Sequence, residues 1–307
     1  MILDSCEYIF ANNSIQEMYI LGLTLFELGY INEGMQIIQN VLKKNNSEYV
    51  FDVSKGIAYL GLGSFSVGNY ELAKKYLLKS SAMGGDFSNE SQNWITILHL
   101  ADKVNYFFEN DFLRFYFVDN FSKINCDKFI DAYTIRYNII QSFFDVHLPK
   151  KIDIFIYSSH KDEICGNLSY ANPPLGSIHV YIWEECGHEL THVICYYLKK
   201  RINFKAKFIN EGVAECFNII EYNNNYQFNS HIIDIFDIWN NYDNYDRNYA
   251  NFIAKKFCLK LLKVGGKQKF IELICEQSIS NAYKIYGKLL YDVKNDVENE
   301  VLLGINC

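Results

Sequence analysis

Positive charge is scarce in this 307-residue chain. Its 29 lysines and arginines are outnumbered by 36 aspartates and glutamates, which gives a net charge of −7, and the densest basic run is KKR at 199–201. Binding to nucleic acid requires a basic stripe or patch on the protein surface. We therefore expect no nucleic-acid partner.

Long apolar runs and a secretion signal are also missing. No stretch has the roughly 18 uninterrupted apolar residues of a membrane-spanning helix, so we expect no membrane partner. The N-terminal MILDSCEYIFANNS carries acids at positions 4 and 7 and no basic region, unlike a signal peptide. The nine cysteines include no CxxC pair, which favours reduced thiols over disulfides. These absences together predict a cytoplasmic protein.

The first hundred residues contain an internal repeat with helical periodicity. Segment 18–45 aligns with segment 57–84 at an offset of 39, and small residues stand at the matched positions 22, 61, 34 and 73. Each copy predicts a helix, a tight glycine-containing turn and a second helix, with the small residues allowing close helix packing. The pattern resembles the tetratricopeptide repeat, which implies a groove for a peptide or protein partner. A helical platform for the rest of the chain is the alternative.

A small mixed sheet is expected after the repeats. The predicted elements are, in order, two strands around an END turn at 105–118, a helix at 126–144, and alternating strands at 151–159 and 177–183. All three prolines lie between 149 and 174, which predicts a loop at NLSYANPPLG (167–176). From about residue 206 onward the pattern is mainly helical.

Two histidines stand four residues apart in CGHELTHVICYY (186–197). On a helix, His188 and His192 lie on the same face, and this spacing lets both imidazoles reach one zinc ion. Glu189 cannot ligate from the same position, but it lies close enough to act as a general base toward a water molecule. Cys186 and Cys195 are expected to be buried free thiols, as is Cys216, because three thiolate ligands would close a site that hydrolysis needs open.

A second amphipathic helix, FINEGVAECF (208–217), carries two acids on one face. Glu211 follows His192 with the spacing HExxH-x18-E, and a carboxylate is the usual third ligand of catalytic His₂Glu zinc sites. Glu215, one turn further on, is placed either to ligate instead or to accept a hydrogen bond from a ligand histidine.

HELTH followed by FINEGVAE resembles the gluzincin metallopeptidases, and more closely their peptidase-MA-like group. The resemblance covers about residues 104–275 and implies one Zn²⁺ per chain, with the two histidines and Glu211 as ligands, Glu189 as the base and Glu215 as the acid that hydrogen-bonds a ligand. The segment that holds a free amino terminus in aminopeptidases is absent, so an exopeptidase is not supported.

The same resemblance implies further site residues. The family's oxyanion donor, often a tyrosine, corresponds to Tyr245 or Tyr249 in YDRNYANFIAKKF, with His231 as a third candidate. The family's substrate-pairing edge strand corresponds to SIHVYIW, where His179 or Tyr181 would bind substrate. The alternative is that both are ordinary sheet side chains.

We therefore predict an α+β chain with an all-α tetratricopeptide-like domain at 1–103 and a gluzincin-like domain at 104–307. The second domain would hold the small mixed sheet, the HExxH helix and the C-terminal helices. The predicted activity is zinc-dependent hydrolysis of peptide bonds in a peptide or protein substrate, by an endopeptidase or a dedicated processing protease. The alternative is a non-catalytic binding protein that uses its repeats to bind a partner, with a relic or structural zinc site. The intact HExxH favours the enzyme.

Overall fold

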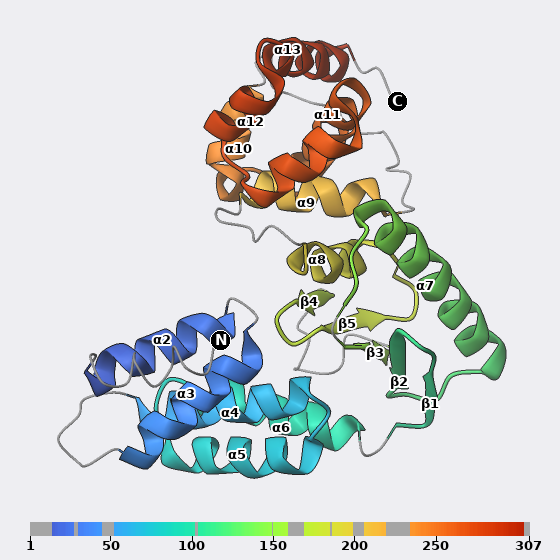
Figure 1. The fold of residues 1–307 in the computed structure, drawn as a ribbon. Helices are drawn as coiled ribbons and strands as arrows, with labels where there is room; N and C mark the ends of the chain where they lie inside the picture. Colours follow the sequence, from blue (N-terminus) through green and yellow to red (C-terminus); the bar gives the residue numbers. More distant parts are fainter. Residues whose placement is uncertain are drawn as a thin grey trace. The chain divides into compact units, whose positions relative to one another are not determined.

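The chain runs through N-terminal helices, a small mixed sheet and C-terminal helices in a computed structural model (Figure 1). The structure describes residues 14–27, 30–44, 52–101, 104–148, 150–158, 169–184, 186–198, 206–218 and 234–303. Two compact units are formed, Met1–Phe121 with Lys150–Tyr181 and Ser122–Pro149 with Ile182–Cys307. The mixed α and β architecture agrees with the predicted class, whereas the boundary expected between residues 103 and 104 stays a prediction.

In the described part of the first unit, five helices precede the sheet, each packed against the next. They are α2 (Ile15–Glu27), α3 (Ile31–Lys44), α4 (Val53–Ser66), α5 (Tyr70–Met83) and α6 (Ser88–Ala101). The pairs α2–α3 and α4–α5 correspond to the two copies of the sequence repeat. Between α4 and α5, Gly68 adopts a φ of +79°, which lets the chain turn. The side chain of Asn69 then caps the N-terminus of α5 by accepting a hydrogen bond from the backbone N–H of Leu72.

Small residues bring the paired helices close together, as the repeat predicts. A Cβ atom added at Gly34 would lie 2.8 Å from the carbonyl oxygen of Gly22, and one added at Gly61 would lie 2.7 Å from Cγ of Leu77. Both distances are shorter than van der Waals contact, so a larger side chain would push the helices apart.

The sheet of the first unit has the strand order β1-β2-β3-β5-β4. Its strands are β1 (Tyr106–Glu109), β2 (Leu113–Phe117), β3 (Ile152–Tyr157), β4 (Tyr170–Asn172) and β5 (Ser177–Tyr181). The three central strands are parallel and the two outer strands antiparallel to their neighbours. Every residue of β3 and β5 is buried, as is typical of parallel strands covered on both faces.

Strand β4 corrects the expectation of a loop over 167–176. Tyr170 pairs with His179 and Asn172 with Ser177, so the chain is already in the sheet before the prolines. Pro173 and Pro174 lie only in the turn between β4 and β5. Gly176, in the same turn, has a φ of +60°.

The second unit is helical. It contains α7 (Lys123–Phe144), α8 (His188–Tyr196), α9 (Lys207–Cys216), α10 (Ile235–Asn240), the short 3₁₀ helix η1 (Tyr242–Asn244), α11 (Arg247–Cys275), α12 (Ile279–Tyr286) and α13 (Leu289–Leu302). Helix α11 changes direction at Gly266, which has a φ of +72°. In the part of the chain that the structure describes, no helix is both long and apolar enough to cross a bilayer.

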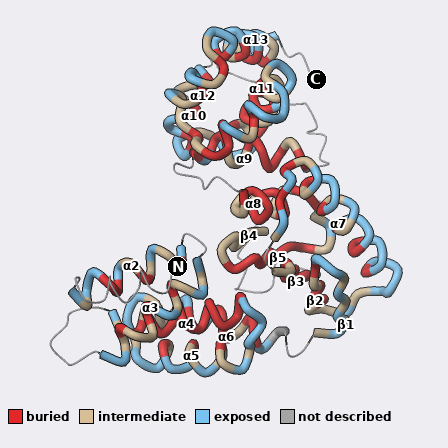
Figure 2. Tube along the Cα trace, viewed as in Figure 1, coloured by how far each residue is buried: buried red, intermediate tan, exposed pale blue. Residues whose placement is uncertain are grey.

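Helices α8 and α9 are held firmly in the core of the second unit. The positions of α8 are buried or half-buried throughout (Figure 2), with Leu190, Val193 and Ile194 fully buried. Helix α9 packs along α11, where a Cβ added at Gly212 would lie 2.7 Å from the carbonyl oxygen of Ala254. This close approach fixes the face of α9 that carries the acids.

Candidate metal centre

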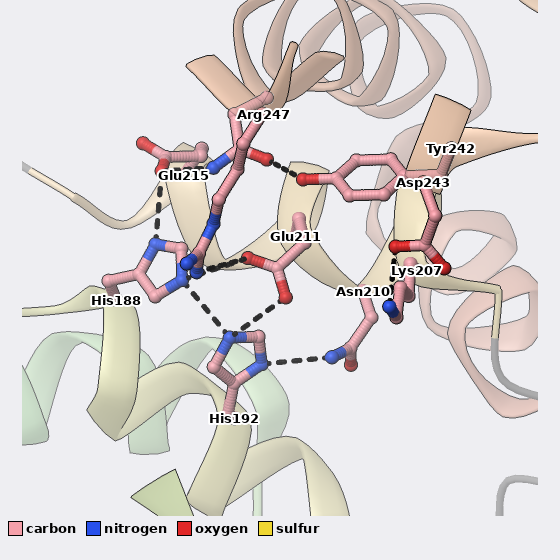
Figure 3. A network of polar contacts seen from close by, with 10 residues as sticks. His188, His192, Lys207, Asn210, Glu211, Glu215, Tyr242, Asp243 and Arg247 are labelled. Carbon is pink, nitrogen blue, oxygen red and sulfur yellow. Dashed lines mark hydrogen bonds and ion pairs between the residues drawn. The ribbon is translucent and has the colours of Figure 1, made fainter. Parts of the chain in front are cut away.

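His188, His192 and Glu211 converge from two helices of the second unit (Figure 3). Nε2 of His188 lies 3.1 Å from Nε2 of His192 and 3.2 Å from Oε2 of Glu211. Nε2 of His192 lies 3.6 Å from Oε1 of Glu211. In the described residues this is the group of side chains that can hold a metal ion, as the spacing of the motif predicts.

The distances within the triad fit a tetrahedral metal ion. Zinc binds nitrogen and oxygen ligands at about 2.0–2.1 Å, which separates neighbouring ligand atoms in a tetrahedron by about 3.3 Å. The three measured separations, 3.1, 3.2 and 3.6 Å, lie around that value. Two imidazole nitrogens facing each other at this distance repel unless a proton or a cation lies between their lone pairs.

The other nitrogen of each ring is already engaged. Nδ1 of His188 lies 3.1 Å from Oε1 of the buried Glu215, and Nδ1 of His192 lies 3.1 Å from the side-chain amide of Asn210. At His188 a proton on Nδ1, donated to Glu215, leaves the lone pair on Nε2, which is the tautomer that a metal-binding histidine needs. At His192 the amide nitrogen of Asn210 donates to Nδ1, and the amide would have to turn its oxygen toward the ring to favour the same tautomer. Glu215 therefore contacts a histidine of the triad, which agrees with one of the two positions the sequence left open.

A relay of side chains holds Glu215 in turn. The amide nitrogen of Asn251 donates to Oε1 of Glu215 over 3.3 Å, and the hydroxyl of Tyr242 donates to the amide oxygen of Asn251. Sequence reasoning missed Asn210, Asn251 and Tyr242. The available signal for Asn251 was an amide between the apolar residues Ala250 and Phe252, and of the three side-chain amides of α11 it is the buried one.

The charges at the triad favour a cation. Burial lowers the pKa of His188, but hydrogen bonds with Glu211 and Glu215 outweigh burial and raise it to about 10. Burial raises the pKa of Glu211, but the hydrogen bond with His188 and the charge of His192 bring it to about 2. The acids therefore attract positive charge to this point, and a divalent ion would meet the same attraction.

Glu189 belongs to the same electrostatic environment. Burial raises the pKa of its carboxyl to about 7. The charge of His188 lowers this pKa, whereas repulsion by Glu211 raises it further. It lies in the first turn of α8, beside a histidine of the triad, where the motif predicts a general base.

Of the two candidate tyrosines, Tyr245 lies between η1 and α11, and Tyr249 lies in the first turn of α11. The hydroxyl of Tyr245 donates to the carboxylate of Asp237, and this hydrogen bond, aided by burial, raises the pKa of Tyr245 to about 12. Tyr249 is half-buried in the first turn of the helix. His231 lies outside the described residues, so the choice of oxyanion donor stays a prediction.

His179 and Tyr181 lie in the core of the first unit. His179 is fully buried, stacks on Phe155 and Tyr170 with centroids 4.8 and 4.6 Å away, and has a pKa lowered to about 3 by burial. Its Nδ1 hydrogen-bonds the hydroxyl of Tyr157 over 3.0 Å. Tyr181 is equally buried. This packing favours the alternative of ordinary sheet side chains, and the substrate-binding role stays a prediction.

A polar cavity of about 380 Å³ adjoins the triad. It is lined by Lys207, Glu211, Tyr242, Asp243, Tyr245 and Arg247. Nη2 of Arg247 lies 4.0 Å from Oε2 of Glu211, and Figure 3 shows the guanidinium beside Glu211 and His188. Arg247 was also missed from the sequence, although it shares a face of α11 with Asn251, four residues on.

The cysteines near the motif form no disulfide in the part of the chain that the structure describes, and they take no part in the triad. Cys186 and Cys195 are buried, as expected, and Cys216 is half-buried. The hydrogen bond that its thiol donates to the carbonyl oxygen of Lys255 holds Cys216 against α11 rather than toward the triad.

Comparison of the chain with protein-family models, curated proteins and solved structures finds no match. The gluzincin and tetratricopeptide assignments therefore rest on the motif, the repeat and the geometry described above.

Proposed function

We propose that this chain is a zinc-dependent peptidase of the gluzincin type. The observation that carries the proposal is the convergence of two imidazole nitrogens and a carboxylate within 4.8 Å of one another, with the opposite nitrogen of each ring already engaged. In the described residues three ligand side chains meet, the number typical of catalytic zinc sites, whereas structural sites usually have four. The adjoining cavity offers room for a substrate group.

Each residue of the site has a role in this proposal. A bound zinc ion would supply Lewis acidity toward water and toward the scissile carbonyl. Glu189 takes a proton from the attacking water and delivers it to the leaving amine. Glu215 fixes the ring of His188 so that its Nε2 would face the ion, and Asn210 contacts the ring of His192 at Nδ1.

The N-terminal helices belong to the proposal as well. The pairs α2–α3 and α4–α5 have the helix–turn–helix form that supports tetratricopeptide-like repeats. We propose that they present a protein substrate or partner to the peptidase, or serve as its platform. A purely non-catalytic binding protein is disfavoured by Glu189, which a structural zinc site does not need.

Substitution Glu189→Gln tests the proposed chemistry. The amide is nearly isosteric but cannot accept a proton, so hydrolysis of a library of synthetic peptides is expected to fall by about 10²–10⁴-fold. Zinc content is expected to stay at the wild-type value, because the ligands are untouched. Glu272→Gln, the same change at an exposed position of α11, is the matched control. Undiminished hydrolysis by the Glu189→Gln variant would contradict the mechanism.

A further inference from the structure

Arg247 is the group at the cavity whose role the proposed chemistry leaves unassigned. Its side chain is 52% exposed, its charge acts on the carboxylate of Glu189, and its Nη2 lies 4.0 Å from Oε2 of Glu211. That separation is too long for a hydrogen bond, so the guanidinium directs its donors toward the cavity without a close acceptor.

The other charges of the cavity are already balanced. Nζ of Lys207 lies 2.5 Å from Oδ1 of Asp243, so these two neutralise each other at the rim. Glu211 is shared with both histidines, and a divalent cation at the triad would take up its charge. With such an ion bound, the carboxylates of Glu189, Glu211 and Glu215 match its charge and that of the guanidinium together. Arg247 therefore offers a substrate its N–H donors rather than surplus charge.

We propose that Arg247 binds a carboxylate of the substrate, which makes this cavity a subsite for an anionic group next to the scissile bond. The inference rests on the proposed peptidase function. The planar guanidinium matches a carboxylate through two parallel N–H···O hydrogen bonds, a pairing that lysine cannot make. The cavity, of about 380 Å³ and lined in part by Tyr242 and Tyr245, is large enough for one residue of a peptide.

Two parts of a peptide can supply this carboxylate. One is the C-terminal carboxylate, which would restrict cleavage to bonds near the end of a chain. The other is an aspartate or glutamate side chain next to the scissile bond, which would permit cleavage within a chain. The chemistry at Arg247 is the same in both cases.

Binding is tested without turnover by side-chain NMR of the full chain. The sequence holds only four arginines, so the Nε–Hε signal of Arg247 can be identified through Arg247→Lys. On titration with N-acetylglycine this signal is expected to shift saturably, and the neutral N-acetylglycinamide is expected to bind at least about tenfold more weakly. The signal of Arg114, whose Nε lies 2.8 Å from the buried Asp153, is expected to stay fixed. An Arg247 signal that does not move, or moves equally with the amide, would overturn the proposal.

Kinetics then identify the source of the carboxylate. Wild type, Arg247→Gln and Arg247→Lys are compared on a peptide with a free C-terminus, its C-terminal amide, and an amidated peptide with glutamate next to the cleaved bond. The loss of kcat/KM in Arg247→Gln is expected to be at least about tenfold larger for one carboxylate-bearing peptide than for the neutral amide, with partial rescue by lysine. Equal losses on all three peptides would overturn the subsite. If wild type cleaves no peptide, the peptidase proposal fails, while the NMR titration still decides the role of Arg247.

Discussion

At the scale of single residues, both ring nitrogens of His188 contact other side chains. Nδ1 lies 3.1 Å from Glu215, and Nε2 faces His192 and Glu211. The buried carboxylate of Glu215 therefore sets which nitrogen is available to a metal and makes that nitrogen more basic. This one contact links the core of the second unit to the reactivity of the site.

Substitution Glu215→Ala is expected to lower zinc affinity by about 10–100-fold, because the ring of His188 loses the acceptor that fixes its tautomer and orientation. Affinity is measured by competition with a chromophoric chelator. Glu272→Ala, at an exposed position, is the control and is expected to bind zinc as wild type does. Wild-type affinity in Glu215→Ala would show that the contact does not orient a ligand.

The site residues differ in how far local sequence reveals them. His188, His192 and Glu211 could be predicted because helical spacing alone places four-residue neighbours on one face, and because a carboxylate at a familiar spacing follows. Arg247, Asn251 and Tyr242 could not, since no local spacing relates them to α8. Arg247 and Asn251 reach the site because α11 packs along α9, and Tyr242 of η1 joins them through its hydrogen bond to Asn251.

At the scale of elements, the packing of α9 on α11 sets the position of Glu211. Gly212 follows Glu211 directly and faces Ala254 and Cys258 of α11. A glycine here lets the backbones of α9 and α11 approach closely. This tight packing fixes the position of the neighbouring Glu211 carboxylate relative to α8.

Gly212→Ala is expected to destabilise the protein by about 1–3 kcal/mol, because the added methyl group overpacks the contact between α9 and α11. A Cβ at this position would lie 2.7 Å from the carbonyl oxygen of Ala254 and 2.8 Å from Sγ of Cys258. The free energy of unfolding in urea, measured on the metal-free protein, tests this. A variant with the same free energy of unfolding as wild type would mean that α9 and α11 can move apart without loss of stability.

Strands and helices also differ in how well the sequence predicts them. The helix of α7 and the hairpin of β1 and β2 follow from strong local periodicity and a polar turn at Asn110. Strand β4 has only three residues and no alternating pattern. It exists because Tyr170 and its neighbours pair with β5, a tertiary contact that periodicity does not record.

At the scale of the whole molecule, the site is built within one unit. The triad, Glu215 and the relay residues all belong to Ser122–Pro149 with Ile182–Cys307. Metal binding is therefore expected to couple to the folding of this unit, since a ligand that binds only the native state stabilises it.

Removal of metal by a chelator is expected to lower the unfolding temperature of the wild-type protein. At a free zinc concentration of a thousand times Kd, the lost stabilisation is about 4 kcal/mol. The chelator is expected to leave the unfolding temperature of His192→Ala unchanged, because that variant has lost a ligand. Equal shifts in both proteins, followed by calorimetry, would place the metal somewhere other than the triad.

The most direct test of the central claim is metal content per chain, measured by mass spectrometry after reconstitution with zinc. Wild type and His147→Ala, which changes an exposed histidine, are each expected to carry one zinc per chain. His192→Ala is expected to carry none. A wild-type protein without zinc, or an unaltered content in His192→Ala, would contradict the assignment of His188, His192 and Glu211 as a metal centre.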